Sequence, residues 1–288
     1  MKRGAIAGVS TALMTIVGIG CLYWNKAEQR SPTAAAPRHS AVTSGAHSGI
    51  AANPGKSRFV GQFISVGAKA FVVKSTLPSF ASDGLKYVED RLEASRRGDG
   101  LASYEIYLRV RACRHALSAE SDLTFPAYAS LGEGGEYLKE RKQQILLCEG
   151  LALKDEMMGR DWLSLAAAQG SLEARLMYAT VPEDVLGGAE QMLQDPAAVI
   201  NYKRTALRYL EESAASGSVD ALGTLGAIYK NGITAPYEPV LAAAYFAAAK
   251  RAKGNGNAQE ALADDGLPIE QQKAALELSE KIYRGCCR

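Results

Sequence analysis

The sequence predicts an all-α protein in which short helices stack in pairs as an α/α solenoid, preceded by a transmembrane helix and a flexible linker. Three observations predict this fold class. Alanine is abundant and aromatic residues make up only 7% of the chain, which favours closely packed helices over a large sheet. A motif of 13 residues occurs twice. A long uncharged stretch directly follows Lys2 and Arg3 at the N-terminus.

The cellular location of the protein is predicted from residues 1–24. Residues 4–24 carry no charged side chain, and at about 1.5 Å per residue they are long enough to cross the hydrocarbon layer of a membrane. The short basic flank before them predicts a single-pass inner-membrane protein with its C-terminal body in the periplasm. Two alternatives to this anchor remain open, a cleaved signal peptide and a lipoprotein signal that ends at Cys21.

Residues 25–57 are predicted to form a disordered linker, because they are rich in Ala, Ser, Pro and Gly and nearly lack large apolar side chains. The net charge of +2 is uneven: residues 1–57 carry six Lys or Arg against Glu28, which gives +5 and leaves −3 for the rest. A net acidic body lacks the field that binds phosphates, so no nucleic acid is expected. His39 and His47 have no Cys or paired carboxylates nearby, and no metal is expected.

Residues 58–158 are predicted to be helical. The apolar spacing from Phe59 to Val72 predicts a helix that Pro78 ends. A second helix is predicted to begin at a cap formed by Ser82 or Asp83 and to end at Gly98.

Cys113 and Cys148 each lie late in one of the next two amphipathic stretches. In an oxidising compartment two antiparallel helices would bring them together, and we expect a disulfide. Closing a loop of about 36 residues would stabilise the fold by about 3 to 4 kcal/mol. The alternative is two buried thiols, which a cytoplasmic protein would have.

Residues 159–256 contain an internal repeat. The segments WLSLAAAQGSLEA (162–174) and YLEESAASGSVDA (209–221) share an aromatic-Leu pair, a run of small residues, a Gly-Ser corner and a final Ala. YFAAAKRAKGN (245–255) resembles the same helix end, so the corner glycines are Gly170, Gly217 and Gly254. Alanine faces let two helices approach closely, and glycine permits a left-handed cap between them.

The segment from residue 221 to residue 232 resembles the first helix of the Sel-one-like repeats, a branch of the tetratricopeptide-type α/α superhelix. The signature Ala-x3-Leu-Gly-x2-Tyr-x2-Gly is matched by Ala221, Leu225, Gly226, Tyr229 and Gly232. The second helix of the unit is matched more loosely, at Ala206, Tyr209, Ala214, Ala215 and Gly217. The resemblance covers residues 162–255, with an insertion at 181–198 that departs from the pattern. It implies adaptor work in envelope assemblies or signalling.

We therefore expect a protein–protein interaction scaffold or adaptor in the bacterial cell envelope. It would bind another protein or peptide through its helical-repeat surface, and the candidates for that contact are Tyr178, Tyr229, Lys230 and Tyr245. Tyr229 also matches a packing position of the repeat. The motifs HExxH, GxSxG and GxxxxGK[ST] do not occur in the sequence, so no enzyme and no cofactor are expected.

Other interpretations remain open. An envelope enzyme acting on cell-wall glycan would use carboxylates in the loop 121–136 or in the insertion 181–198, and a purely structural module is also possible. The arginines at 109, 111 and 114 either bind acidic partners or face water.

Residues 257–288 are predicted to form a capping helix, from Pro268 to Arg284, and a tail that contains Cys286 and Cys287. Adjacent cysteines seldom bridge each other, so a frayed tail or an intermolecular link is expected.

Overall fold

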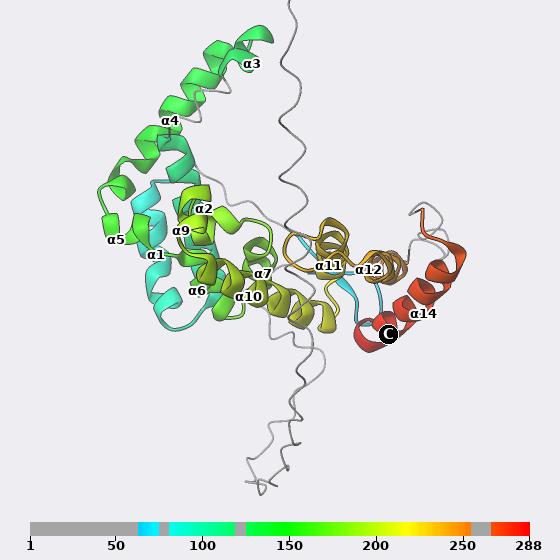
Figure 1. The fold of residues 1–288 in the computed structure, drawn as a ribbon. Helices are drawn as coiled ribbons and strands as arrows, with labels where there is room; N and C mark the ends of the chain where they lie inside the picture. Colours follow the sequence, from blue (N-terminus) through cyan, green and yellow to red (C-terminus); the bar gives the residue numbers. More distant parts are fainter. Residues whose placement is uncertain (1–62, 75–80, 119–124, 255–265) are drawn as a thin grey trace, which may run out of the picture. The chain divides into compact units, whose positions relative to one another are not determined.

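The structure, a computed structural model, describes residues 63–74, 81–118, 125–254 and 266–288 (Figure 1). The chain divides into a unit of residues 1–52 and a unit of residues 53–288, and all described residues belong to the second unit. The predicted anchor at 1–24 and linker at 25–57 therefore lie outside the described residues. Within the described part, no helix combines the length and the apolar character needed to cross a bilayer.

The described chain is mostly helical, which confirms the predicted class in its coarse form. The elements in chain order are β1 (Phe63–Ser65), β2 (Phe71–Val73), α1 (Gly84–Arg96), α2 (Gly100–Leu117), α3 (Phe125–Ser130), α4 (Gly134–Ala152), α5 (Asp155–Gly159), α6 (Trp162–Ala168), α7 (Leu172–Tyr178), α8 (Pro182–Leu186), α9 (Ala189–Gln194), α10 (Pro196–Ala215), α11 (Val219–Asn231), α12 (Pro239–Ala252) and α14 (Ile269–Cys286). In the C-terminal part, consecutive described helices pack on one another: α10 on α11, α11 on α12 and α12 on α14 (Figure 1).

A β-hairpin occupies residues 63–73, where the sequence predicted a helix. Strands β1 and β2 pair antiparallel with Phe63 opposite Val73. The backbone amides of Val66 and Gly67 both donate to the carbonyl of Ala70, at 2.9 and 3.2 Å, and close the turn. The prediction of a helix over Phe59 to Val72 was therefore wrong for the described residues.

The hairpin is held by contacts with distant helices. The amide of Phe71 donates to the carbonyl of Gly217 at 3.0 Å, and the amide of Val73 donates to the Asp220 carboxylate, 147 residues later, at 2.7 Å. A Cβ atom at Gly217 would lie 2.2 Å from the carbonyl oxygen of Lys69, so only glycine permits this approach. The apolar spacing of this segment is compatible with the period of a helix and with the period of a strand. The long-range contacts with Gly217 and Asp220 favour the strand.

Helix α2 lies at the centre of the N-terminal half. It packs against α1, α4, α5, α6 and α7, and it is buried on most sides. Asp83 and Asp99 cap α1 and α2 by accepting hydrogen bonds from first-turn amides, and Asp83 is one of the two capping residues that the sequence predicted for α1. Cys113 on α2 is bonded to Cys148 on α4, with the Cα atoms 5.4 Å apart, in agreement with the predicted disulfide.

The two Gly-Ser corners of the internal repeat have the same hydrogen-bond pattern. The amide of Ser171 donates to the carbonyl of the residue five positions earlier at 3.1 Å, and the amide of Ser218 does the same at 3.1 Å. Each serine hydroxyl then caps the next helix, at 3.1 Å for Ser171 and 3.2 Å for Ser218. Gly170 and Gly217 have φ angles of 94° and 104°, in the region that favours glycine. The repeated sequence therefore forms repeated corners.

The C-terminal helices pack through small residues. Gly226 on α11 faces α12, and a Cβ atom there would lie 2.9 Å from the ring of Phe246. Alanines of α12 and Ala275 of α14 form a small core of their own. The predicted helix at Pro268 to Arg284 is present as α14. The expectation of a frayed or intermolecular tail is corrected, because Cys286 and Cys287 are bonded to each other and buried.

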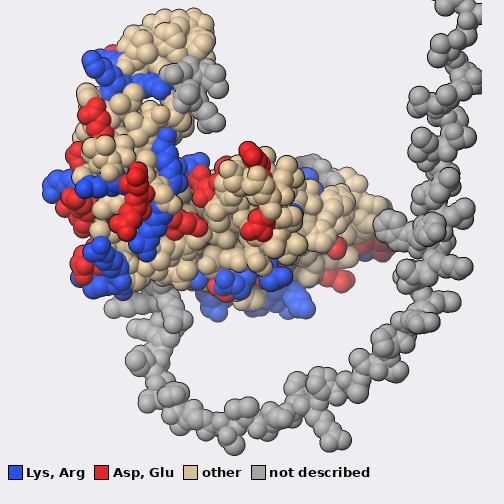
Figure 2. Space-filling view, turned by 60° about the vertical axis from the view of Figure 1, so that its left-hand side comes forward, with Lys and Arg blue, Asp and Glu red and all other residues tan. Residues whose placement is uncertain are grey.

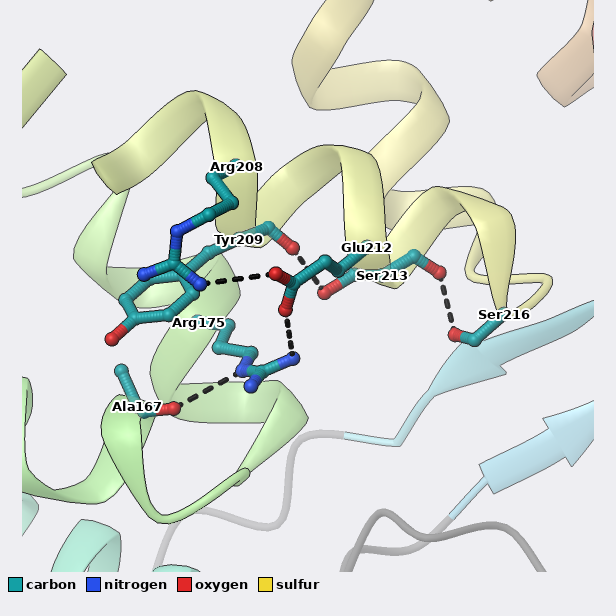
Figure 3. Close-up of polar contacts among 7 residues, drawn as sticks. All are labelled: Ala167, Arg175, Arg208, Tyr209, Glu212, Ser213 and Ser216. Atoms are coloured by element: carbon teal, nitrogen blue, oxygen red, sulfur yellow. Dashed lines mark hydrogen bonds and ion pairs between the residues drawn. The ribbon is translucent and has the colours of Figure 1, made fainter. Parts of the chain in front are cut away.

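Arg175 joins three helices (Figure 3). From α7, its Nε donates to the carbonyl of Ala167 on α6 at 3.1 Å, and its Nη1 lies 3.0 Å from the carboxylate of Glu212 on α10. Arg208 binds the other oxygen of Glu212 at 3.0 Å. Both guanidinium groups lie against the Tyr209 ring, at 5.0 Å for Arg175 and 4.6 Å for Arg208. The Arg175 side chain is 14% exposed, whereas that of Arg208 is 53% exposed.

We predict that Arg175→Ala lowers the free energy of unfolding by about 2 kcal/mol, because it removes charge-assisted hydrogen bonds in a poorly solvated place. Arg208→Ala is the matched control, since it removes a guanidinium from the same carboxylate and the same ring, and a loss below about 1 kcal/mol is expected for this exposed pair. Urea unfolding of the two variants gives both values. Equal losses would mean that Arg175 does not join the helices in the way described.

Candidate functional site

Tyr178, one of the four candidates for partner contact, packs in the core. It is 6% exposed, its ring stacks on Tyr202 at 5.1 Å, and it meets Tyr209 edge-on at 5.4 Å. Its carbonyl accepts a hydrogen bond from the Tyr202 hydroxyl at 2.7 Å. Burial, followed by Tyr209 and Asp161, raises the pKa of Tyr178 to about 12. Its candidacy is therefore corrected, because its side chain is not on a surface that a partner reaches.

The structure brings two of the other candidates together. The rings of Tyr229 on α11 and Tyr245 on α12 stack in parallel with their centroids 5.8 Å apart, and both are half-buried. Lys230 is exposed, and its Nζ lies 6.0 Å from the ring centroid of Phe246. The Tyr229–Tyr245 stack is thus the part of the predicted surface on which a site can be built.

Tyr245 opens into a groove between α10 and α14, which we call the α10–α14 groove. Its volume is about 350 Å³. It is lined by Glu211, Ala214, Ala215, Leu222, Tyr245, Leu278, Lys281, Ile282, Gly285 and Cys286. The residues from α10 and from α14 follow helical spacing, so each helix contributes one continuous face. The groove is therefore mainly apolar, with one acidic side chain on the α10 wall and one basic side chain on the α14 wall.

Glu211 supplies the negative charge of this groove. No residue that the structure describes forms a hydrogen bond or an ion pair with its carboxylate, in contrast to the adjacent Glu212. Its field acts on the tyrosine stack: burial, then Tyr229 and Glu211, raise the pKa of Tyr245 to about 12. The pKa of Tyr229 is raised as well, by burial first and then by Glu211 and Glu238. The α10 side of the groove therefore carries a negative charge near the tyrosine stack.

The Cys286–Cys287 disulfide closes the groove at the end of α14. Cys286 lines the groove, and both cysteines belong to the main core together with Tyr283 and Ile282. The sequence indicated the apolar face of α14 but gave no sign that Glu211, Leu278 and Cys286 would meet. These residues come from two helices that are separated in the chain by α11 and α12.

A larger hollow of about 590 Å³ lies among α2, α4 and α8. It contains the arginines that the sequence suggested for acidic partners, but these side chains hold the fold together. Arg111 lies 2.8 Å from the carboxylate of Asp184 on α8, which also accepts the Tyr107 hydroxyl. Arg114 donates to the carbonyl of Met158 at 3.0 Å, and Arg109 is buried and donates to the carbonyl of Ser82. Asp184 is one of the carboxylates of the insertion 181–198 that the enzyme alternative would use.

A third hollow, of about 710 Å³, lies beside α11 and α12 near Asp220, Lys250 and Lys253. Asp220 already accepts the Val73 amide, so its charge holds the hairpin.

The charges of the described surface are mixed. On the face drawn in Figure 2, Lys and Arg side chains are interspersed with Asp and Glu side chains, and this face has no continuous basic surface of the kind that binds phosphates. In the described ranges, no three His, Cys, Asp or Glu side chains are placed to hold a metal ion. Comparisons of this chain with protein-family models, with curated proteins and with solved structures found no match.

Proposed function

We propose that this protein is a binding scaffold of the bacterial cell envelope that holds a short segment of another protein in the α10–α14 groove. The observation that carries the proposal is the groove itself, in which apolar side chains from four helices converge beside the Tyr229–Tyr245 stack and a carboxylate without a partner among the described residues. Tyrosine is favoured at such contacts, because its ring is large and its hydroxyl remains able to form hydrogen bonds.

The successive packing of α6 on α7, α7 on α10, α10 on α11, α11 on α12 and α12 on α14 supports a solenoid of the Sel-one-like type. Solenoids of this kind present extended surfaces to peptides and helices. The Cys113–Cys148 disulfide supports an oxidising compartment. Together with residues 4–24 as an anchor, this favours the periplasmic face of the inner membrane.

Site-specific photocrosslinking in living cells tests this proposal. A photoreactive amino acid at position 278 or 281, within the groove, is expected to crosslink to one and the same protein. The same amino acid at position 156, on the exposed face of α5, is the control and is expected to give no such product.

A second change makes the test specific to the groove. Ala215 is exposed and lines the groove, so Ala215→Trp fills it without disturbing the core. We expect the crosslink from position 281 to disappear in this variant. Crosslinks that persist when the groove is filled, or that occur equally from position 156, would overturn the proposal.

A further inference from the structure

The two adjacent glutamates at the end of α10 differ in their surroundings. Glu212 is bound by Arg175 and Arg208, each at 3.0 Å. Glu211 has no ion pair within the described residues, although it lies in the same turn of the same helix. Glu211 is exposed and lines the α10–α14 groove, so its carboxylate is available to a cation that a partner supplies.

The tyrosine stack adds to the attraction for a cation. The face of an aromatic ring carries negative charge density, and a Lys or Arg group within about 6 Å of such a ring is attracted to it. Tyr245 lines the groove together with Glu211, and Tyr229 stacks on it at 5.8 Å. A cation beside Tyr245 would thus meet a carboxylate and an aromatic ring at once.

The remaining lining determines where the cation lies and what accompanies it. Lys281 is on the α14 wall and repels a cation there, so the cation belongs on the α10 side. Leu278, Ile282 and Leu222 form an apolar surface next to it. A volume of about 350 Å³ is small for a ligand site and holds one or two side chains rather than a whole helix.

We propose that the α10–α14 groove selects a partner segment in which a lysine or arginine binds Glu211 and Tyr245 while an adjacent large apolar residue packs on Leu278 and Ile282. This inference rests on the proposed function, and it specifies the chemistry of the partner. The contact resembles the cation recognition that aromatic side chains and a carboxylate provide together in other sites.

Selection from random 12-residue peptides displayed on phage, against the purified full-length chain in detergent, tests the preference. The peptides retained by the wild-type protein and lost on Ala215→Trp are the groove binders. We expect them to be enriched in Lys or Arg next to Leu, Ile, Phe or Met, and to be depleted of Asp or Glu at the basic position.

Calorimetry with the most enriched peptide then tests the role of Glu211. Glu211→Gln is expected to weaken binding about fivefold to tenfold, and more strongly at low salt than at high salt. Glu156→Gln is the matched control, because it removes the same charge from an exposed position on α5 and is expected to leave affinity unchanged. Glu211→Lys is expected to abolish binding of this peptide and to permit binding of a version with Glu in place of its basic residue.

The possible outcomes separate the two proposals. Groove-binding peptides without a basic residue, or with an affinity unaffected by Glu211→Gln, would overturn the cation preference and leave the binding groove in place. If no selected peptide is lost on Ala215→Trp, both the preference and the proposed function are overturned. Circular dichroism of each variant confirms that the fold is retained, as we expect because Glu211 is exposed.

Discussion

Replacing Cys113 and Cys148 together with alanine is expected to lower the free energy of unfolding by about 3 to 4 kcal/mol, because the unfolded chain regains the entropy of a long loop. The bond spans 35 positions and joins α4 to α2, and Cys148 and Leu151 are the only buried residues of α4. Urea unfolding measures the loss, and hydrogen exchange should show α4 losing protection before α2.

The chain offers an internal control for this explanation. Cys286 and Cys287 are also bonded and buried, but they are adjacent in the sequence. Their bond therefore closes no loop and hardly restricts the unfolded chain. Replacing this pair with alanine is expected to cost less than half as much as replacing Cys113 and Cys148. Equal losses from the two double variants would show that burial of the sulfur atoms, rather than loop closure, determines the effect.

The helices were predictable where local signals agree. Helix α1 follows an amphipathic stretch for which the sequence predicted a cap at Ser82 or Asp83 and an end at Gly98, and the structure places it at Gly84–Arg96 with Asp83 as the cap. The hairpin at 63–73 was not predictable in the same way. Its strands contain only three residues each, and the groups that bind them, Gly217 and Asp220, come from a different part of the sequence. A local pattern carries no information about such partners.

In the candidate site too, the residues in local motifs were predictable and the contacts between distant segments were not. The repeat signature located Tyr229, and the third helix end located Tyr245, which the structure stacks together. In the local sequence Arg208 stands three positions before Glu211 and four before Glu212, within reach of either glutamate. The second arginine that binds Glu212, Arg175, comes from α7 and could not be predicted from the local sequence. Tyr178 was misjudged for a related reason: a tyrosine on an amphipathic helix suits a surface or a core, and the approach of Tyr202 places it in the core.

Gly217→Ala is expected to release the hairpin from the helices. Its φ angle of 104° is strained for alanine, and the added Cβ atom would lie 2.2 Å from the backbone oxygen of Lys69, which cannot move independently of the hairpin turn. Together these effects should cost about 3 kcal/mol or more of the free energy of unfolding. Hydrogen exchange should show faster exchange of the amides of Phe71 and Val73, which lose their bonds to Gly217 and Asp220.

Gly170→Ala separates the two causes. Gly170 occupies the equivalent corner of the repeat with a φ angle of 94°, but a Cβ atom there meets nothing within 4 Å. Its substitution should cost only the backbone strain, about 1 to 2 kcal/mol, and should leave exchange in residues 63–73 unchanged. Gly170→Ala could instead speed hydrogen exchange in residues 63–73 as much as Gly217→Ala does. Backbone strain at the Gly-Ser corners would then be the cause, and the close approach of Lys69 would not be what requires glycine at position 217.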